Sequence, residues 1–170
     1  MGKSCAQFGT KDNSPAEIQD IRTSIEAEAK TSGVDPRFIL AIVMQETKGC
    51  TRVPTTSNGV TNPGLMQSHN GSTCEKDEVP CPKSKIALMI KDGTSGTAGK
   101  PGGGDGLKQC LTQAKGKDAV QTYEAARIYN SGSYLGVDLS DANGATRCYA
   151  SDVANRLTGW TGETGEGCKN

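Results

Sequence analysis

The sequence contains few large apolar residues, because Leu, Ile, Val and Phe together account for only 26 of its 170 positions. Its longest uninterrupted apolar run, from Phe38 to Met44, has seven residues. A membrane-spanning helix needs roughly 20, so we expect no membrane association. The length fits one domain, residues 1–170 with its core at about 15–160, and such a thin core needs stabilisation from other sources.

An excess of charge of either sign is also absent. Nineteen Lys and Arg residues balance nineteen Asp and Glu residues, which gives a formal net charge of zero. Proteins that bind nucleic acids carry a basic excess, so we expect no nucleic-acid partner. A low apolar content is typical of disordered chains only when the net charge is high, and we therefore expect a folded domain. We also expect the protein to be a monomer.

Histidine is nearly absent, and cysteine pairs of the metal-binding kind are missing. His69 is the only histidine, and none of the seven cysteines belongs to a C-x-x-C pair. We therefore expect neither a metal nor an organic cofactor. Seven cysteines in a small domain indicate disulfides instead, with six paired and one left over in a connectivity that the sequence does not fix. Because disulfides form in oxidising compartments, we expect a secreted protein. The first ten residues do not supply the signal peptide, because they lack its apolar segment.

Strand signals are sparse, and the helix signals predict a mainly α domain. Ser14-Pro15-Ala16-Glu17 is typical of a capping box at a helix start, and Gly33 ends that helix. A second helix is predicted from Asp35-Pro36 to about Lys48. Since residues 38–44 are apolar on all sides, we expect this helix at the centre of the domain.

The remaining chain predicts shorter elements. The segment Ser57-Asn58-Gly59 favours a small β-hairpin, and the seven glycines within Asp92–Gly106 predict a flexible surface loop. Further helices are predicted over residues 83–91, 106–114, 117–130 and 145–158.

Glu46 is the most informative single residue. It lies in the last turn of the second predicted helix, four residues after Ile42 and three after Val43, on a face that should be buried. Burial and the negative end of the helix dipole both disfavour a carboxylate, so this pattern predicts a raised pKa, suited to a general acid at neutral pH. The alternative is structural, because Lys48 is close enough to pair with Glu46.

The irregular segment Asn62-Pro63-Gly64-Leu65-Met66-Gln67-Ser68 has the composition of a sugar-binding loop. Amides and hydroxyls bond the substituents of a sugar ring, while Leu65 and Met66 would pack against its faces. The alternative is a turn with a buried Leu-Met anchor. The next residue, His69, is either a hydrogen-bonding loop residue or a further substrate contact.

A third cluster, Ala126–Gly132, closes a predicted helix with Tyr129 and Asn130. Tyr129 could pack its ring inside and hydrogen-bond a carboxyl or acetamido group. By itself this cluster is also typical of an ordinary helix end.

In this order, the three clusters resemble the soluble lytic transglycosylases and goose-type lysozymes, glycoside hydrolase family 23. The matching segments are Gln45-Glu46-Thr47, Gly64-Leu65-Met66-Gln67 and Ile128-Tyr129-Asn130-Ser131-Gly132. Thr47 stands where bacterial members usually have Ser, and Ile128 replaces an Ala. The segments ILAIVMQE, NPGLMQSHNG, KDGTSGT and SDVANRL are similar to a secreted fungal branch of that family.

The resemblance covers about residues 15–160 and implies a fold and an activity. The fold is a mainly α, lysozyme-like domain with long disulfide-stapled loops and at most a small β-hairpin. Glu46 is implied as the catalyst, and Gly64–His69, Tyr129 and Asn130 as the substrate-binding residues. The implied partner is peptidoglycan or a related N-acetylated polysaccharide.

The expected mechanism uses one acid. Glycosidases usually need two carboxylates, but no Asp or Glu lies between Glu46 and Gln67, and Asn58 and Asn62 occur where goose-type lysozymes place aspartates. Glu46 would protonate the glycosidic oxygen, with assistance from the acetamido group of the substrate. Water as acceptor makes the protein a muramidase, which we favour. The 6-hydroxyl of the sugar as acceptor makes it a lytic transglycosylase, and chitin remains open as substrate.

Two other classes of function remain as alternatives. A non-catalytic glycan-binding protein would keep the Gly64–Ser68 loop while tolerating the loss of Glu46. A cysteine protease built on Cys50 and His69 lacks any protease motif, and a disulfide is the better use of Cys50. Packing roles are expected for Trp160 and Tyr149.

Overall fold

The computed structural model describes residues 1–57, 59–136 and 138–163. These residues form a mainly helical structure with one small antiparallel sheet, as predicted. The elements are η1 (Ala6–Phe8), α1 (Pro15–Ser32), α2 (Pro36–Thr47), β1 (Thr56–Ser57), β2 (Thr61–Asn62), α3 (Lys83–Ser95), α4 (Leu107–Gln113), α5 (Asp118–Ser131) and α6 (Tyr149–Leu157). Within the described residues, every helix is too short or too polar to span a lipid bilayer.

The first helix begins and ends as its sequence predicts. The Ser14 hydroxyl accepts a hydrogen bond from the Glu17 N–H, and the Glu17 carboxylate accepts one from the Ser14 N–H at 2.7 Å. At the other end, Gly33 adopts a left-handed conformation (φ 79°) and donates its N–H to the Ala29 carbonyl. The capping box and the glycine stop are therefore confirmed.

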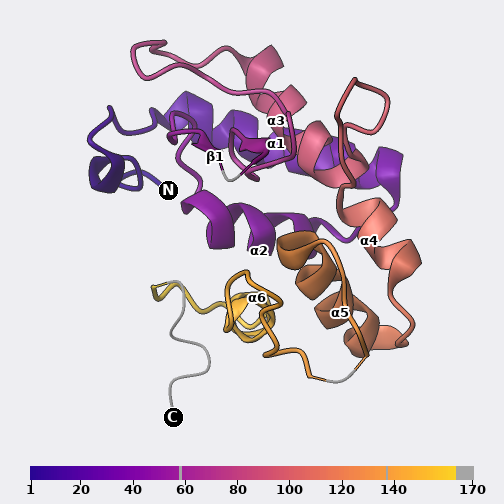
Figure 1. Cartoon of the computed structure of the whole chain (residues 1–170). Coiled ribbons are helices and arrows are strands. Elements are labelled where there is room, and N and C mark those ends of the chain that lie inside the picture. Colours follow the sequence, from indigo (N-terminus) through magenta and orange to yellow (C-terminus); the bar gives the residue numbers. More distant parts are fainter. Residues whose placement is uncertain (58, 137, 164–170) are drawn as a thin grey trace.

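Helix α2 lies at the centre of the domain, between α1 on one side and α6 on the other (Figure 1). Asp35 caps its start by accepting a hydrogen bond from the Arg37 N–H at 2.8 Å. Its buried apolar side chains are Phe38, Ile39, Ala41, Ile42 and Val43. Leu40 is 41% exposed, so the helix is central but is not buried on all sides.

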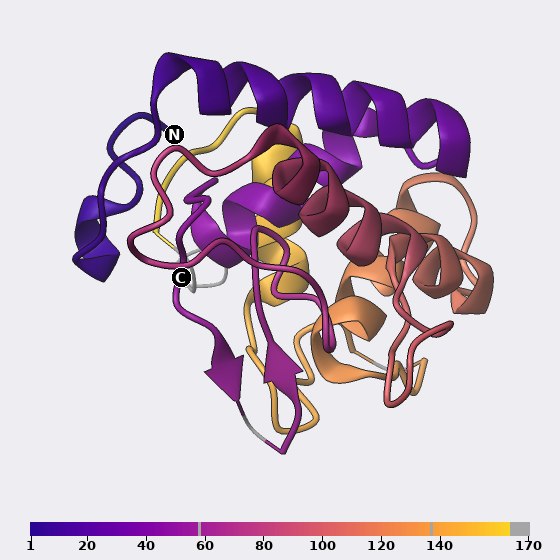
Figure 2. The same ribbon diagram turned by 90° about the horizontal axis from the view of Figure 1, so that it is seen from above.

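The β-hairpin also forms near its predicted position and projects from one edge of the molecule (Figure 2). Thr56 of β1 pairs with Asn62 of β2, and Ser57 pairs with Thr61. Asn58, in the predicted turn, lies outside the described residues.

The prediction of a flexible surface loop over Asp92–Gly106 is confirmed in part: residues 96–106 form no helix or strand and residues 98–102 are exposed, but the segment starts inside a helix. Residues 92–95 belong to α3, and the buried Asp92 carboxylate accepts hydrogen bonds from the Ser72 N–H (2.8 Å) and hydroxyl (2.7 Å). Farther along, Gly103 lies so close to Thr97 that a Cβ on it would stand 1.8 Å from the Thr97 carbonyl oxygen. The glycines in this segment thus permit close backbone packing, which composition alone does not distinguish from flexibility.

Disulfides stabilise the thin core, as expected. One joins Cys5 to Cys50, a second joins Cys74 to Cys81, and Cys148 is also disulfide-bonded. Cys110 is free and buried, and Cys168 lies outside the described residues.

Candidate functional site

Glu46 lies where α2 ends and is held by a residue from α6. Its carboxylate is half-buried and accepts a hydrogen bond from the Tyr149 hydroxyl, across 103 residues of sequence. Lys48, the alternative partner expected for Glu46, adopts a left-handed conformation (φ 53°) and pairs with Glu163 instead. The Glu46 carboxylate therefore has a neutral hydrogen-bond donor as its neighbour, where a lysine ammonium was the alternative.

The surroundings of Glu46 set its protonation. Burial raises the pKa of Glu46 to about 7, although the hydrogen bond from Tyr149 opposes this shift. Burial raises the pKa of Tyr149 well above its usual range, and the adjacent Glu46 charge raises it further. Tyr149 thus stays protonated and donates a hydrogen bond to Glu46. The Glu46 side chain itself is partly acid and partly carboxylate near neutral pH. The sequence-based prediction of a raised pKa at Glu46 is confirmed.

A pocket of about 340 Å³ opens beside Glu46. Tyr149 and Thr146 line it together with Asn130, from the end of α5. The remaining lining residues include Gln7, Phe8, Lys48 and Glu163. Because Gln7 and Phe8 come from the start of the chain, segments far apart in sequence enclose the carboxyl group.

The Gly64–Gln67 segment packs on the end of α2. Gly64 has φ 75°, and a Cβ there would lie 2.2 Å from the Ser72 carbonyl oxygen, so only glycine fits. The Thr47 hydroxyl donates to the Leu65 carbonyl at 2.9 Å. Leu65 and Met66 are both 0% exposed, and the prediction that their side chains pack against sugar rings is therefore wrong. They form the buried anchor that was the alternative.

The polar residues that follow this anchor face a second pocket, of about 280 Å³. Gln67 accepts a hydrogen bond from the Thr56 hydroxyl at 2.8 Å and donates to the Gly64 carbonyl at 3.1 Å. Tyr129 donates to the Met66 carbonyl at 2.8 Å. The pocket lining includes Asn62, Gln67, Ser68, His69, Asp105, Tyr129 and Asn130.

Ser68 leaves a buried polar atom in this second pocket. Its side chain is 4% exposed, and its hydroxyl oxygen has no hydrogen-bond partner among the described residues. Buried hydroxyls are usually satisfied, and one titratable neighbour of Ser68 in this pocket is Tyr129. Burial, the larger effect, raises the pKa of Tyr129, while the Ser68 hydroxyl lowers it.

Asn130 joins the two pockets, because it lines both. Its side-chain oxygen accepts hydrogen bonds from the Arg127 guanidinium and from the Thr146 N–H at 3.0 Å, which fixes its orientation. The predicted residues Glu46, Gln67, Ser68, His69, Tyr129 and Asn130 thus line two adjoining pockets. Neither pocket is lined by the other three predicted residues, Gly64, Leu65 and Met66.

Sequence reasoning missed several residues of this site. Tyr149 was assigned to packing, because no local motif connects it to Glu46 and only the α2–α6 contact brings the two together. Asp105 was placed in a flexible loop, but it lines the second pocket and accepts a hydrogen bond from Gln113 at 2.6 Å. Neither residue has a signal in its neighbouring sequence that could have found it.

Comparison with known proteins adds no relative. A scan against protein-family models, a search of curated proteins and a search of solved structures each found no match. The geometry of the two pockets therefore carries the functional argument.

That geometry provides acid chemistry. Within the part of the chain that the structure describes, no group of three or more His, Cys, Asp or Glu residues is placed to hold a metal ion. Hydrogen bonding to Lys48 lowers the pKa of Glu163, which shares the first pocket with Glu46. The site thus combines a carboxyl group with a pKa of about 7, at Glu46, with amide and hydroxyl groups along the adjoining pocket.

Proposed function

We propose that this protein is a secreted muramidase, which hydrolyses the β-1,4 bonds between N-acetylmuramic acid and N-acetylglucosamine in bacterial peptidoglycan. The proposal depends on one observation: the carboxyl group of Glu46 lies beside a pocket and has a pKa of about 7. A general acid works best when its pKa lies near the working pH, because it is then protonated and still able to release the proton.

The residues around Glu46 suit an N-acetylated sugar chain. The second pocket offers amide and hydroxyl groups from Gln67, Ser68 and Asn130, which match the acetamido and hydroxyl substituents of such a polymer. The motifs around Glu46, Gly64 and Tyr129 resemble those of family 23 glycosidases, which supports the same reaction. Disulfides support secretion, since they persist in oxidising compartments.

In the proposed reaction, Glu46 donates its proton to the glycosidic oxygen as the bond to the anomeric carbon breaks. The acetamido oxygen of the sugar that contains this anomeric carbon then attacks the carbon. The departing sugar keeps the proton on its hydroxyl group. Glu46, now a carboxylate, removes a proton from the incoming water, which attacks the anomeric carbon and restores the acetamido group. Tyr149 holds the Glu46 carboxyl group in place through its hydrogen bond.

The decisive test is Glu46→Gln, which keeps the shape of the side chain but carries no acidic proton to transfer. We expect this variant to lose at least about 100-fold of its activity in clearing suspensions of bacterial cell walls, the usual range for a general acid. Glu26→Gln, on the exposed face of α1, is the matched control. Full activity in Glu46→Gln would remove Glu46 from catalysis and leave a glycan-binding protein as the alternative.

Product analysis separates the remaining reactions. Parallel digests of peptidoglycan and of N-acetylglucosamine oligomers, followed by mass spectrometry, identify the substrate and the new chain ends. We expect ordinary reducing ends from peptidoglycan. Products lighter by one water would show the anhydro ends of a lytic transglycosylase, and turnover confined to the oligomers would show a chitinase.

A further inference from the structure

Residues 4–13, here called the N-terminal strap, precede α1 and cross the end of α2 just beyond Glu46. In Figure 2 this indigo segment extends from one end of α1 along the side of the molecule. The strap contains η1, and the resemblance to known glycosidases does not include it.

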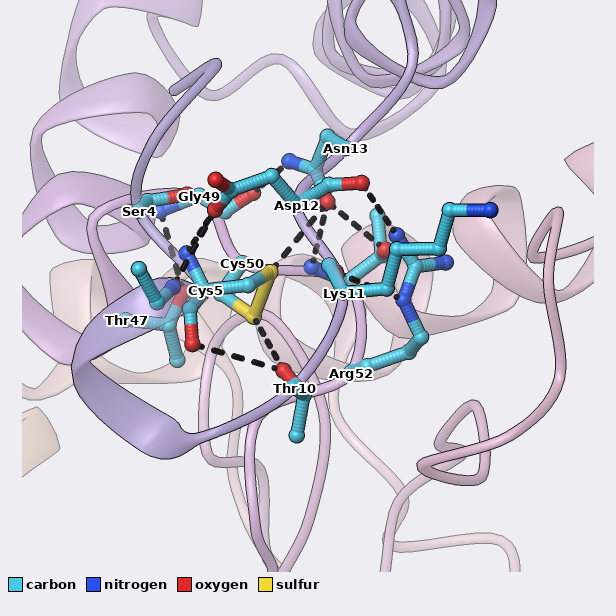
Figure 3. Close-up of a disulfide and its surroundings, with 12 residues drawn as sticks. Ser4, Cys5, Thr10, Lys11, Asp12, Asn13, Thr47, Gly49, Cys50 and Arg52 are labelled. Atoms are coloured by element: carbon cyan, nitrogen blue, oxygen red, sulfur yellow. Dashed lines mark hydrogen bonds between the residues drawn. A yellow bond between two sulfur atoms is a disulfide. The ribbon is translucent and has the colours of Figure 1, made fainter.

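The strap is fixed to the residues that follow Glu46. The Cys5–Cys50 disulfide joins it to the fourth residue after Glu46 (Figure 3). Asn13 donates to the Gly49 carbonyl at 2.6 Å and accepts hydrogen bonds from the Thr51 N–H (3.2 Å) and hydroxyl (2.8 Å). Asn13 is buried, so these bonds are shielded from water.

A buried arginine fixes the strap a second time. Arg52 is 1% exposed, and its guanidinium donates to the Lys11 carbonyl and to the Asp12 carbonyl, each at 3.1 Å (Figure 3). The Asp12 carboxylate in turn accepts hydrogen bonds from the Cys5 and Ala6 N–H groups at 3.0 and 3.1 Å. The strap is therefore a fixed wall, because both of its ends are bonded to the same short segment.

This wall presents two side chains to the Glu46 pocket, Gln7 and Phe8. Phe8 is half-buried and packs on the small apolar cluster of Cys5, Cys50 and Val53. Gln7 is exposed, and its amide nitrogen donates to the Ser4 carbonyl at 2.7 Å. Its amide oxygen has no hydrogen-bond partner among the described residues, so the wall offers an aromatic ring beside an available acceptor.

Resting on the proposed function, we infer that Gln7 and Phe8 form a sugar subsite for the polymer chain next to Glu46, held in place by the Cys5–Cys50 disulfide. One face of a pyranose ring carries mainly C–H groups, which pack well against an aromatic ring. The adjacent acetamido N–H or a ring hydroxyl donates to the Gln7 amide oxygen. The polymer would then run from the second pocket, past Asn130 and Glu46, to the strap.

The test measures binding without turnover. In the Glu46→Gln background, titration calorimetry with the β-1,4-linked hexamer of N-acetylglucosamine gives the Kd. We expect Phe8→Leu to raise this Kd roughly tenfold, because leucine keeps the contact with the disulfide cluster but loses the flat ring. Phe8→Tyr keeps an aromatic ring at this position and should leave the Kd at the parent value. Gln7→Ala should raise the Kd severalfold, whereas Gln19→Ala, on the exposed face of α1, should not change it.

A tether variant tests the role of the disulfide. Replacing Cys5 and Cys50 together by Ser should raise the Kd at least as much as Phe8→Leu does, in protein whose circular dichroism retains the helical signal. An unchanged Kd in this variant would contradict the role of the tether.

The subsite is overturned if Phe8→Leu binds the hexamer as tightly as the parent, or if the Glu46→Gln parent binds no hexamer. The first result leaves the proposed function standing, because the loss of wall lysis in Glu46→Gln tests that function separately. Conversely, hexamer binding that depends on Phe8, in a protein that does not cleave cell walls, contradicts the muramidase and not the subsite.

Discussion

The proton on Glu46 is controlled by two opposing effects from its neighbours. Burial raises its pKa to about 7, and the Tyr149 hydroxyl pulls it down by hydrogen-bonding the charged form. The helix end and the buried residues of α2 were readable in the sequence, so the raised pKa could be predicted. Tyr149 could not, because its position depends on how α6 packs against α2.

The activity should therefore depend on pH in a definite direction. Glu46 must be protonated in the free enzyme, so kcat/KM should fall as the pH rises above about 7. Tyr149→Phe removes the hydrogen bond that favours the carboxylate, and we expect the alkaline limb to move up by about one pH unit. Tyr123→Phe, at a half-buried tyrosine of α5, should leave the profile unchanged. A limb that moves down, or not at all, would contradict the assigned role of Tyr149.

The same pKa has a consequence for stability. Since the pKa of Glu46 in the folded state lies above the value of about 4.5 for an exposed glutamate, its contribution is most favourable below about pH 4.5 and is lost as the pH rises towards 7. Glu46→Gln has no such charge to bury. Urea unfolding should show it to be more stable than the parent at pH 8, by on the order of 1–3 kcal/mol, with the difference shrinking at pH 5. If Glu46→Gln were less stable than the parent at pH 8, burial of the Glu46 carboxylate would not be destabilising.

Helix ends were predictable from local chemistry, whereas close packing between elements was not. The Ser14–Glu17 capping box and the Gly33 stop involve residues a few positions apart, so the sequence contains both partners. Helix α3 runs to Ser95, and its residue Asp92 is buried against Ser72, a contact across 20 residues. Glycine content predicts flexibility or close approach equally well until the neighbouring backbone is known.

Two glycines of the same segment test this distinction. A Cβ on Gly103 would meet the Thr97 carbonyl oxygen at 1.8 Å, while a Cβ on Gly99 would have nothing within 4 Å. We expect Gly103→Ala to lower the free energy of unfolding by about 1–3 kcal/mol, as overpacking does, and Gly99→Ala to change it by less than about 0.5 kcal/mol. Thermal denaturation of both variants measures the difference. Equal stabilities would restore the interpretation of this segment as a loose loop.

The whole domain is connected by a few buried polar links around a small apolar core. The ion pair of Glu17 and Arg52 joins α1 to the segment after α2, with side-chain exposures of 2% and 0%. Composition predicted that such links were needed and that cysteines would supply some of them. It could not identify the partners, because each link joins residues that are far apart in the sequence.

The buried pair should dominate the acid sensitivity of the fold. Burial alone would raise the pKa of Glu17, but hydrogen bonds from Arg52 and from the Ser14 and Cys81 N–H groups lower it to about 2. Because this pKa is depressed, its contribution is present above about pH 4.5 and is lost as the pH falls towards 2. Glu17→Gln should cost about 3–5 kcal/mol at pH 7, since it leaves Arg52 buried without its counterion.

The control for this pair is exposed on the same helix. Glu26 pairs with Arg22, with side-chain exposures of 51% and 71%, and Glu26→Gln should cost less than about 1 kcal/mol. Urea unfolding between pH 2 and 7 should show a shallower acid slope for Glu17→Gln than for the parent. If both variants lost the same stability, the buried pair would have no special role.

The free cysteine has a consequence for the lifetime of the disulfides. Burial raises the pKa of the Cys110 thiol to about 12, and its side chain is 2% exposed. Disulfide exchange begins when a thiolate attacks a sulfur atom, so a thiol that neither ionises nor reaches solvent is a poor attacker. We therefore expect Cys110 in the folded protein to exchange slowly with the Cys5–Cys50 and Cys74–Cys81 bonds at neutral or mildly alkaline pH.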